Sequence, residues 1–229
     1  MDYLQNLKKI LDITIKEKSS DLLISVNHPP VIRVTGQLVP LVKEKKVTPE
    51  DCRGLAFSLM TESKKNKLLA DKEVDFSYDF EGKARFRVNV FFQRGNISIA
   101  MRLIPPDIKT IEDLQLPPIL HEFTKKSQGL VLVTGASGQG KSTTLAALID
   151  EINNTRALHI ITIEDPIEYV YKNDRGVVDQ RDVSYDTNSF SSSLRSSFRQ
   201  NPDLIMVGEM RDLETISTTI TAAETGNLV

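Results

Sequence analysis

The residues best suited to bind phosphate lie in a short glycine-rich segment, residues 135–142. Its sequence, GASGQGKS, matches the pattern G-x-x-x-x-G-K-[ST]. Glycines allow positive φ angles, so that backbone N–H groups can approach an anion closely. The lysine of this pattern reaches the outer phosphates of a nucleoside triphosphate, and the hydroxyl residue after it binds Mg²⁺. The predicted phosphate contacts are Gly135, Ala136, Ser137, Gly138, Gln139, Gly140, Lys141, Ser142 and Thr143.

Two acidic residues follow predicted strands and are candidates to complete this chemistry. Apolar runs near 158–164 and 203–208 lead to Glu164 and Glu209. In an open parallel sheet, ligands bind beyond the carboxyl ends of the strands, so both acids should point toward the phosphate loop. Phosphoryl hydrolysis needs a metal ligand and a group that orients water, and two acids fit that need. Each acid alone is also compatible with an exposed residue that begins a loop.

The segment from Lys83 to Pro106 is basic and contains no acid, in a chain of net charge −2. Its alternation predicts a hairpin with a turn at Gly95-Asn96, one apolar face, and a cationic face that includes Arg85 and Arg102. Such arginines could stabilise charge at a nucleotide bound by a neighbouring subunit. A solvated strand face and a nucleic-acid patch are alternatives. Few exposed aromatic residues accompany the arginines, which disfavours stacking on single strands, and no nucleic-acid partner is predicted.

The elements that must position these residues change character near Pro105-Pro106-Asp107, where we predict a domain boundary. Up to that point the sequence predicts an α+β region. Its helices are expected near 2–17, 49–60 and 62–70, and its strands near 22–26, 31–34, 37–39, 74–80, 84–93 and 97–104.

From Gly129 onward, predicted strands alternate with predicted helices, which is typical of a mainly parallel sheet with right-handed crossovers. The strands are expected near 130–134, 158–164 and 203–208, and the helices near 141–154, 188–200 and 212–225. Another helix is expected before Gly129, near 118–126. The predicted organisation is a first domain over 1–104, a linker over 105–117 and an α/β domain over 118–229.

Composition excludes several classes of protein. The chain has 229 residues, of which 40% are hydrophobic and 26% are charged. Its single cysteine, Cys52, permits no disulfide within the chain and no cysteine-based zinc site. No apolar run is long enough to span a membrane, and the first residues lack the layout of a signal peptide. A cytosolic protein is expected.

Several segments together resemble the type II/IV secretion ATPase superfamily, and within it the type IV pilus retraction ATPases that drive twitching motility. The N-terminal region is similar to that family at the segment ARFRVN, residues 84–89. The other matching segments are GASGQGKSTT at 135–144, ITIEDPIEY at 161–169, NPDLIMVGEMRDLET at 201–215 and AAETGNLV at 222–229.

The resemblance implies a PAS-like N-terminal domain, a RecA-like ATPase domain and a ring of six identical subunits. It also implies a motor that uses ATP and Mg²⁺ and acts with a platform protein at the cytoplasmic face of the inner membrane to retract the pilus. By position, it assigns water activation to Glu164 and Mg²⁺ binding to Glu209 with Ser142. It assigns to Arg85 and Arg102 an approach to nucleotide within the ring.

The chain departs from the family pattern near its end. The family has a histidine where this chain has Asn227, and a histidine could sense phosphate by changing charge whereas asparagine cannot. The sequence stops as a predicted strand begins, so a truncated piece of a longer protein is expected. Alternative interpretations are a type II secretion or pilus-extension ATPase and a non-hydrolysing regulatory subunit of such a ring.

Overall fold

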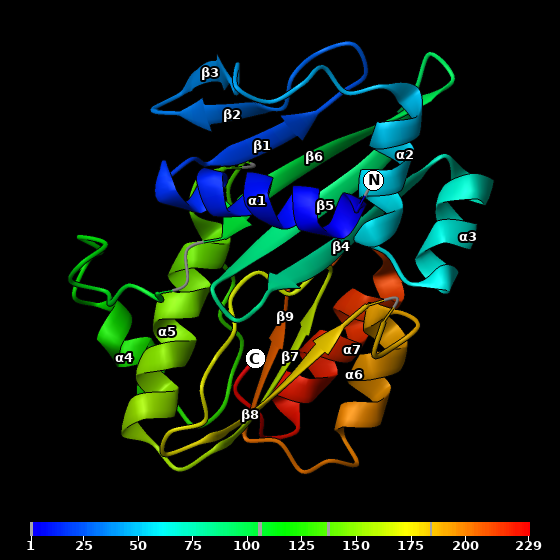
Figure 1. Ribbon diagram of the computed structural model, residues 1–229. Coiled ribbons are helices and arrows are strands. Elements are labelled where there is room, and N and C mark those ends of the chain that lie inside the picture. Colours follow the sequence, from blue (N-terminus) through cyan, green and yellow to red (C-terminus); the bar gives the residue numbers. More distant parts are fainter. Residues whose placement is uncertain (1, 105–106, 137, 184) are drawn as a thin grey trace. The chain divides into compact units, whose positions relative to one another are not determined.

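The computed structural model describes residues 2–104, 107–136, 138–183 and 185–229. The chain divides into two compact units, Met1–Pro106 and Asp107–Val229 (Figure 1). Residues 105 and 106 of the predicted linker lie outside the described residues, and residues 107–117 group with the second unit. Each unit has its own sheet and its own buried core.

The first unit is built on an antiparallel sheet of six strands in the order β3-β2-β1-β6-β5-β4. Alternation of side chains on β5 buries Phe86, Val88 and Val90 and leaves Arg85 only partly buried on the opposite face, as the sequence predicts. The strands are β1 (Asp21–Ile24), β2 (Val31–Val34), β3 (Gln37–Pro40), β4 (Glu73–Phe80), β5 (Ala84–Gln93) and β6 (Asn96–Ile104).

Three helices belong to the first unit: α1 (Tyr3–Lys16), α2 (Pro49–Ser58) and α3 (Glu62–Asp71). The helix α2 begins where local chemistry requires it. Thr48 and Asp51 form a reciprocal capping box, and Pro49 occupies the first turn, where no N–H is needed. Helices α1 and α2 lie over one face of the sheet in Figure 1, and their buried side chains join the strand residues in one core.

The turn between β5 and β6 lies one residue earlier than the predicted Gly95-Asn96. Gln93 pairs with Asn96, so the two turn residues are Arg94 and Gly95. Their φ angles of 49° and 77° are both positive, as a two-residue hairpin of this twist requires. The prediction was wrong by one position because asparagine and glycine both suit this conformation, and strand register decided between them.

The second unit contains the parallel strands β7 (His159–Glu164), β8 (Val177–Asp182) and β9 (Leu204–Val207) in the order β8-β7-β9. Parallel bridges continue the pairing from Leu204 to Leu228 and from Leu228 to Gly129. The prediction of a parallel α/β arrangement is confirmed. The segment at 130–134 forms no regular strand, which corrects the expectation, although the N–H of Val131 donates to the carbonyl of Val229 at 2.8 Å.

Helices cover both faces of this parallel sheet. On one face α5 packs on Ile160 and Met206, and on the other α6 and α7 pack on Ile161 and Ile205. Successive residues of each strand therefore face opposite cores, which is why these strands read as continuous apolar runs. Within the described ranges, no helix is long and apolar enough to cross a bilayer. The helices of this unit are α4 (Leu120–Thr124), α5 (Lys141–Thr155), α6 (Phe190–Ser197) and α7 (Leu213–Glu224).

Candidate functional site

The phosphate loop has the backbone that its glycines predict. The φ angles of Gly135, Gly138 and Gly140 are 155°, 78° and 85°, a region that residues with a side chain rarely adopt. The Nζ of Lys141 donates to the carbonyls of Gly135 and Ala136, both at 2.9 Å. These bonds place the ammonium group at the loop itself. The predicted contact Ser137 lies outside the described residues.

Helix α5 begins directly at this loop and presents its N-terminus there. Gly140 is the N-cap in a left-handed conformation, and no side chain of the described residues caps the helix. The first N–H groups of a helix have no partner within it and carry the positive end of the helix dipole, so this end attracts an anion. The Thr143 hydroxyl lies 3.1 Å from the hydroxyl of Tyr169, which joins this first turn to the segment after β7.

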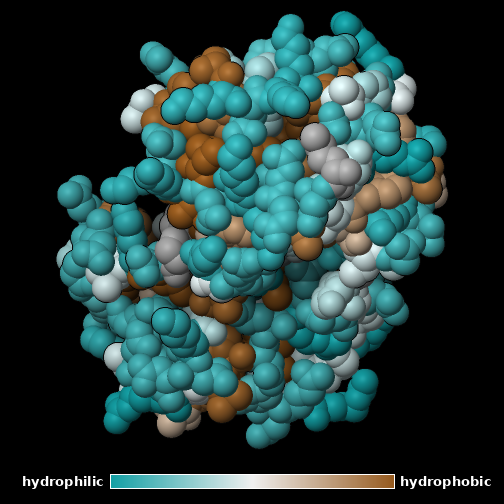
Figure 2. Space-filling model, viewed as in Figure 1, coloured by the Kyte–Doolittle hydropathy of each residue, from teal (hydrophilic) through white to brown (hydrophobic). Residues whose placement is uncertain are grey.

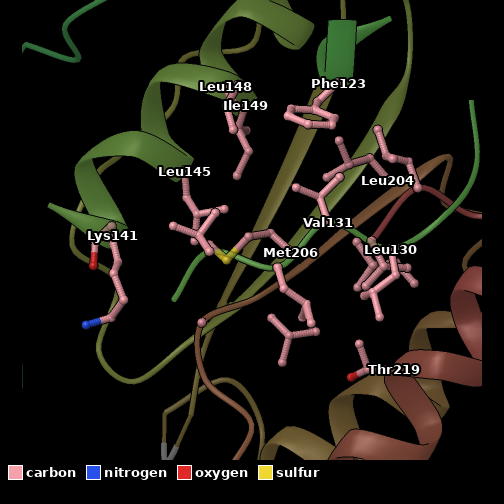
Figure 3. Close-up of a pocket in the computed structure, with 18 of the residues that line it drawn as sticks. Phe123, Leu130, Val131, Lys141, Leu145, Leu148, Ile149, Leu204, Met206 and Thr219 are labelled. Carbon is pink, nitrogen blue, oxygen red and sulfur yellow. The ribbon is translucent and has the colours of Figure 1, made fainter. Parts of the chain in front are cut away.

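A cavity of about 380 Å³ adjoins the loop. Its polar end is lined by Gly135, Lys141, Ser142 and Glu209. The rest is mostly apolar, and Figure 3 shows Lys141 at one side of a cluster of aliphatic side chains from α5, β9 and the segment after Gly129. The structure thus brings three residues that the sequence singled out, Lys141, Ser142 and Glu209, to one cavity.

Glu164 is the last residue of β7 and Glu209 comes two residues after the adjacent parallel strand β9, so both lie at the carboxyl ends of the strands. Ile163 is paired with Val207, and the N–H of Gly208 donates to the carbonyl of Ile163 at 2.8 Å. A Cβ built on Gly208 would stand 3.1 Å from that carbonyl oxygen and 3.4 Å from the Cα of Glu164. The absence of a side chain at this glycine therefore permits the close approach of the two strand ends.

The carboxylate of Glu164 is buried and accepts three hydrogen bonds. Oε1 accepts from the Thr162 hydroxyl at 2.7 Å and from Nε2 of Gln180 at 3.2 Å, and Oε2 accepts from the N–H of Glu168 at 3.3 Å. Burial raises the pKa of Glu164, because the charged form loses hydration, and the hydrogen bonds oppose that rise only in part. A buried carboxylate with a raised pKa takes up a proton more readily than an exposed one.

Sequence reasoning missed the two side chains that hold Glu164. Thr162 precedes it by two residues on the same strand and so shares its face, a signal that the sequence does contain. Gln180 comes from β8, a strand that was not predicted, and no signal near Glu164 points to it. Gln180 Nε2 also donates to the carbonyl of Tyr169 at 2.7 Å, so this amide connects β8, Glu164 and the segment after β7.

Glu209 is in a different environment. Its side chain is about one-third exposed at 36%, and its Oε2 accepts from Nη2 of Arg211 at 2.8 Å. Such an accessible pair is worth little to stability, so the carboxylate is free to exchange the arginine for another cation at small cost. Arg211, two residues further along the chain, was not identified from the sequence.

The predicted arginines belong to the first unit, whereas the loop belongs to the second. Arg102 is largely exposed, and its Nε donates to Oδ1 of Asp21 at 3.2 Å. The other oxygen of Asp21 is paired with Nε of Arg33 at 3.3 Å. The Nε of Arg85 is buried and has no hydrogen-bond partner among the residues that the structure describes.

Asn227 lies at the opposite end of the sheet from the phosphate loop. Its side-chain amide donates to the carbonyl of Pro202 at 2.6 Å, just before β9 begins, and Leu228 pairs with Leu204 at the start of that strand. At about 3.3 Å per residue, the four steps along the chain from Leu204 to Gly208 separate Asn227 from the site by about 13 Å. The side chain of Asn227 therefore has a structural role at the start of β9, away from the phosphate loop of its own chain.

Comparison with known proteins identifies the family. The model for the type II/IV secretion system protein family matches residues 4–229. The chain belongs to this family. Among its members, the chain is 43% identical over 228 residues to the type IV pilus retraction ATPase PilT of Pseudomonas aeruginosa, covering 98% of this chain and 65% of that protein.

A second curated protein and a solved structure are similar to this chain and also carry names that refer to twitching motility or pilus retraction. A twitching motility protein of Neisseria gonorrhoeae is 42% identical over 200 residues, covering 87% of this chain and 53% of that protein. The crystal structure of the pilus retraction motor PilT with bound ADP superposes with a TM-score of 0.93 at 47% identity, covering 97% of this chain and 65% of the PilT chain. The chain thus spans less than two thirds of the length of each of these relatives.

Proposed function

We propose that this protein is an ATP-hydrolysing motor subunit that powers type IV pilus retraction. The observation that supports this function most strongly is the cavity where Lys141, Ser142 and Glu209 meet beside the N-terminus of α5. The similarity to PilT, which bears the name of a pilus retraction ATPase and has a structure with ADP, supports the same assignment.

The residues of the loop fit a nucleoside triphosphate with Mg²⁺. The positive φ angles, the uncapped helix N-terminus and the Lys141 ammonium all favour an anion at one place. Among the described residues, no cluster of three or more histidine, cysteine or acidic side chains could hold a metal alone. This suits Mg²⁺, which takes few protein ligands and several phosphate and water oxygens. We assign the Ser142 hydroxyl and the Glu209 carboxylate to it.

Bound Mg²⁺ would neutralise charge that develops on the transferred phosphoryl group. The residues of this chain then perform the remaining tasks. Lys141 holds the outer phosphates, and Glu164 orients the attacking water and accepts its proton. Burial suits Glu164 to this role, because the raised pKa brings its proton affinity nearer to the working pH. The accessible Glu209 is the better metal ligand of the two acids.

The proposed protein is a ring of six copies, each with a PAS-like first domain over 1–104 and a RecA-like domain over 118–229. In such a ring, Arg85 and Arg102 can act on the nucleotide of a neighbouring subunit. Among the described residues, the buried Nε of Arg85 has no hydrogen-bond partner, and the exposed Arg102 is paired with Asp21. We propose that both approach the nucleotide of a neighbouring subunit, where a guanidinium stabilises phosphoryl charge. The ring would act in the cytoplasm, against a platform protein at the inner membrane.

The first test is nucleotide binding by Lys141→Ala. Loss of charge-assisted bonds to phosphate should weaken binding of Mg²⁺-ATP by roughly 10- to 100-fold, measured by titration with a fluorescent ATP analogue. Lys172→Ala removes an exposed lysine elsewhere in the same unit and is the matched control, with binding expected to be unchanged.

Hydrolysis separates the roles of the two acids. Glu164→Gln should retain Mg²⁺-ATP binding and lose phosphate release, because an amide cannot accept the proton.

Each variant also has an outcome that would contradict the proposal. Unchanged ATP binding in Lys141→Ala would exclude the loop as the nucleotide site. Normal turnover in Glu164→Gln would leave binding intact but exclude Glu164 as the group that activates water.

A further inference from the structure

The outer edge of the six-stranded sheet carries exposed apolar side chains. We call residues 37–46, strand β3 and the loop after it, the β3 edge. All four residues of β3 are exposed, and among the described strands β3 lies at the end of the sheet and pairs with β2 alone. Leu38 is 52% exposed, Val39 is 42% exposed and Val42 is 79% exposed. Figure 2 shows hydrophobic surface, surrounded by hydrophilic atoms, over the β2–β3 side of the first unit.

The same edge is cationic. Lys43, Lys45 and Lys46 are exposed, and none of them has an ion pair within the described part of the chain. The one acid of the segment, Glu44, is already paired with Nζ of Lys9 at 2.7 Å. In a chain of net charge −2, this places three uncompensated positive charges beside the apolar side chains.

Backbone hydrogen bonds fix the shape of the β3 edge. The N–H of Leu41 donates to the carbonyl of Pro30 at 2.8 Å, and the N–H of Glu44 donates to the carbonyl of Leu41 at 2.8 Å. The N–H of Val47 donates to the carbonyl of His28 at 3.0 Å. The apolar and cationic side chains are thus presented on an ordered backbone, which lowers the entropy cost of binding.

Exposed apolar side chains with lysines alongside fit one class of partner best. Pairing with another strand is disfavoured, because β3 has only four residues and Pro40 has no N–H to donate. A bilayer with anionic headgroups matches both properties, because apolar side chains enter the headgroup region while lysines remain at the charged surface. We propose that the β3 edge docks on an anionic lipid bilayer. This docking does not depend on the proposed ATPase activity.

The test is co-sedimentation with vesicles of phosphatidylcholine, with and without phosphatidylglycerol. The unaltered protein should bind only the anionic vesicles and should bind less at high salt. Each lysine contributes about fivefold to partitioning, so Lys43, Lys45 and Lys46 all changed to glutamate should lower it by at least about 100-fold. Val42→Asp should also lower it, because a charge replaces the most exposed apolar side chain. Circular dichroism melts check that both variants fold.

A matched control changes the net charge equally elsewhere. Lys67, Lys126 and Lys172 are exposed and lie outside the β3 edge, and their change to glutamate should leave vesicle binding nearly unaltered. Failure to bind anionic vesicles would overturn the proposal. So would an equal loss in the control variant, which would indicate an effect of net charge alone. Self-association that Val42→Asp abolishes, without lipid binding, would overturn it in favour of a second copy.

Discussion

The buried hydrogen bond between Thr162 and Glu164 leads to a quantitative prediction. Thr162 is fully buried, and its hydroxyl donates to Oε1 of Glu164 at 2.7 Å. Thr162→Val keeps the shape of the side chain and removes only this donor. We expect the second unit to lose stability, and to lose more of it when Glu164 is ionised than when it is protonated.

The magnitude follows from the charge of the acceptor. A hydrogen bond to an ionised group contributes about 1.5–3 kcal/mol, and one between neutral groups contributes about 1 kcal/mol. Because burial raises the pKa of Glu164 above the unfolded value of 4.5, the folded state holds its proton to higher pH than the unfolded state. The contribution of Glu164 to the free energy of unfolding therefore falls as pH rises from about 4.5 through the folded pKa. The variant should lose about 2 kcal/mol at about pH 8.5 and about 1 kcal/mol at about pH 4.

Urea unfolding at these two pH values, followed by circular dichroism and by hydrogen exchange of β7 amides, measures both losses. Thr219→Val is the matched control, because Thr219 is also buried in the second unit and its hydroxyl donates to the neutral carbonyl of Thr215 at 2.7 Å. Its loss should be at most about 1 kcal/mol and independent of pH. A double-mutant cycle with Glu164→Gln isolates the coupling.

Two results would refute this reasoning. One is an equal loss of stability at both pH values in Thr162→Val. The other is a coupling energy with Glu164 that is no larger than about 0.5 kcal/mol, the scatter expected for independent sites. Either would mean that the carboxylate does not depend on this hydroxyl when it is charged.

Two further predictions concern the same unit. His121 bonds to Glu151 at 2.8 Å and to Glu112 at 3.0 Å, and the hydrogen bond to Glu151 raises its pKa. The charged His121 therefore stabilises the folded state fully below its unfolded pKa, near 6.5, and this stabilisation is lost as pH rises through the folded pKa. In thermal melts, His121→Gln should therefore destabilise the protein more at about pH 5.5 than at about pH 9. An equal effect at both values would contradict this. Gly208→Ala should cost about 1–3 kcal/mol and slow hydrolysis, because the new Cβ meets the carbonyl of Ile163 at 3.1 Å, and unchanged unfolding and turnover would exclude that strain.

Local chemistry made much of the fold predictable. A threonine followed by proline before an amphipathic run predicts the start of a helix. The structure has that start at Thr48-Pro49, where the capping box forms. On β5 the period-two alternation from Phe86 to Val90 is enough to separate the buried face from the arginines, because successive side chains of a strand point to opposite faces. The register at Arg94-Gly95 required the partner strand, because both neighbouring dipeptides permit a tight turn.

Strand β8 shows where sequence reasoning fails. Its six residues, VVDQRD, contain only two apolar side chains, so no hydrophobic run marks it. It becomes a strand because it pairs in parallel along the whole of β7, from His159 to Glu164. The pairing supplies hydrogen bonds that compensate for weak local propensity. The segment at 130–134 is the converse, an apolar run that reads as a strand and yet forms no regular one.

The sequence by itself determined the phosphate loop, the start of α5 and the strand ends at Glu164 and Glu209. These depend on residues that are contiguous in the chain and on the rule that parallel strands end at one edge of their sheet. Only the tertiary structure decided that Glu164 is buried against Gln180 while Glu209 remains accessible. It also decided that Asn227 lies at the end of the parallel sheet opposite the phosphate loop. Those outcomes depend on which distant segments pack together, and desolvation by such packing is what makes one acid different from the other.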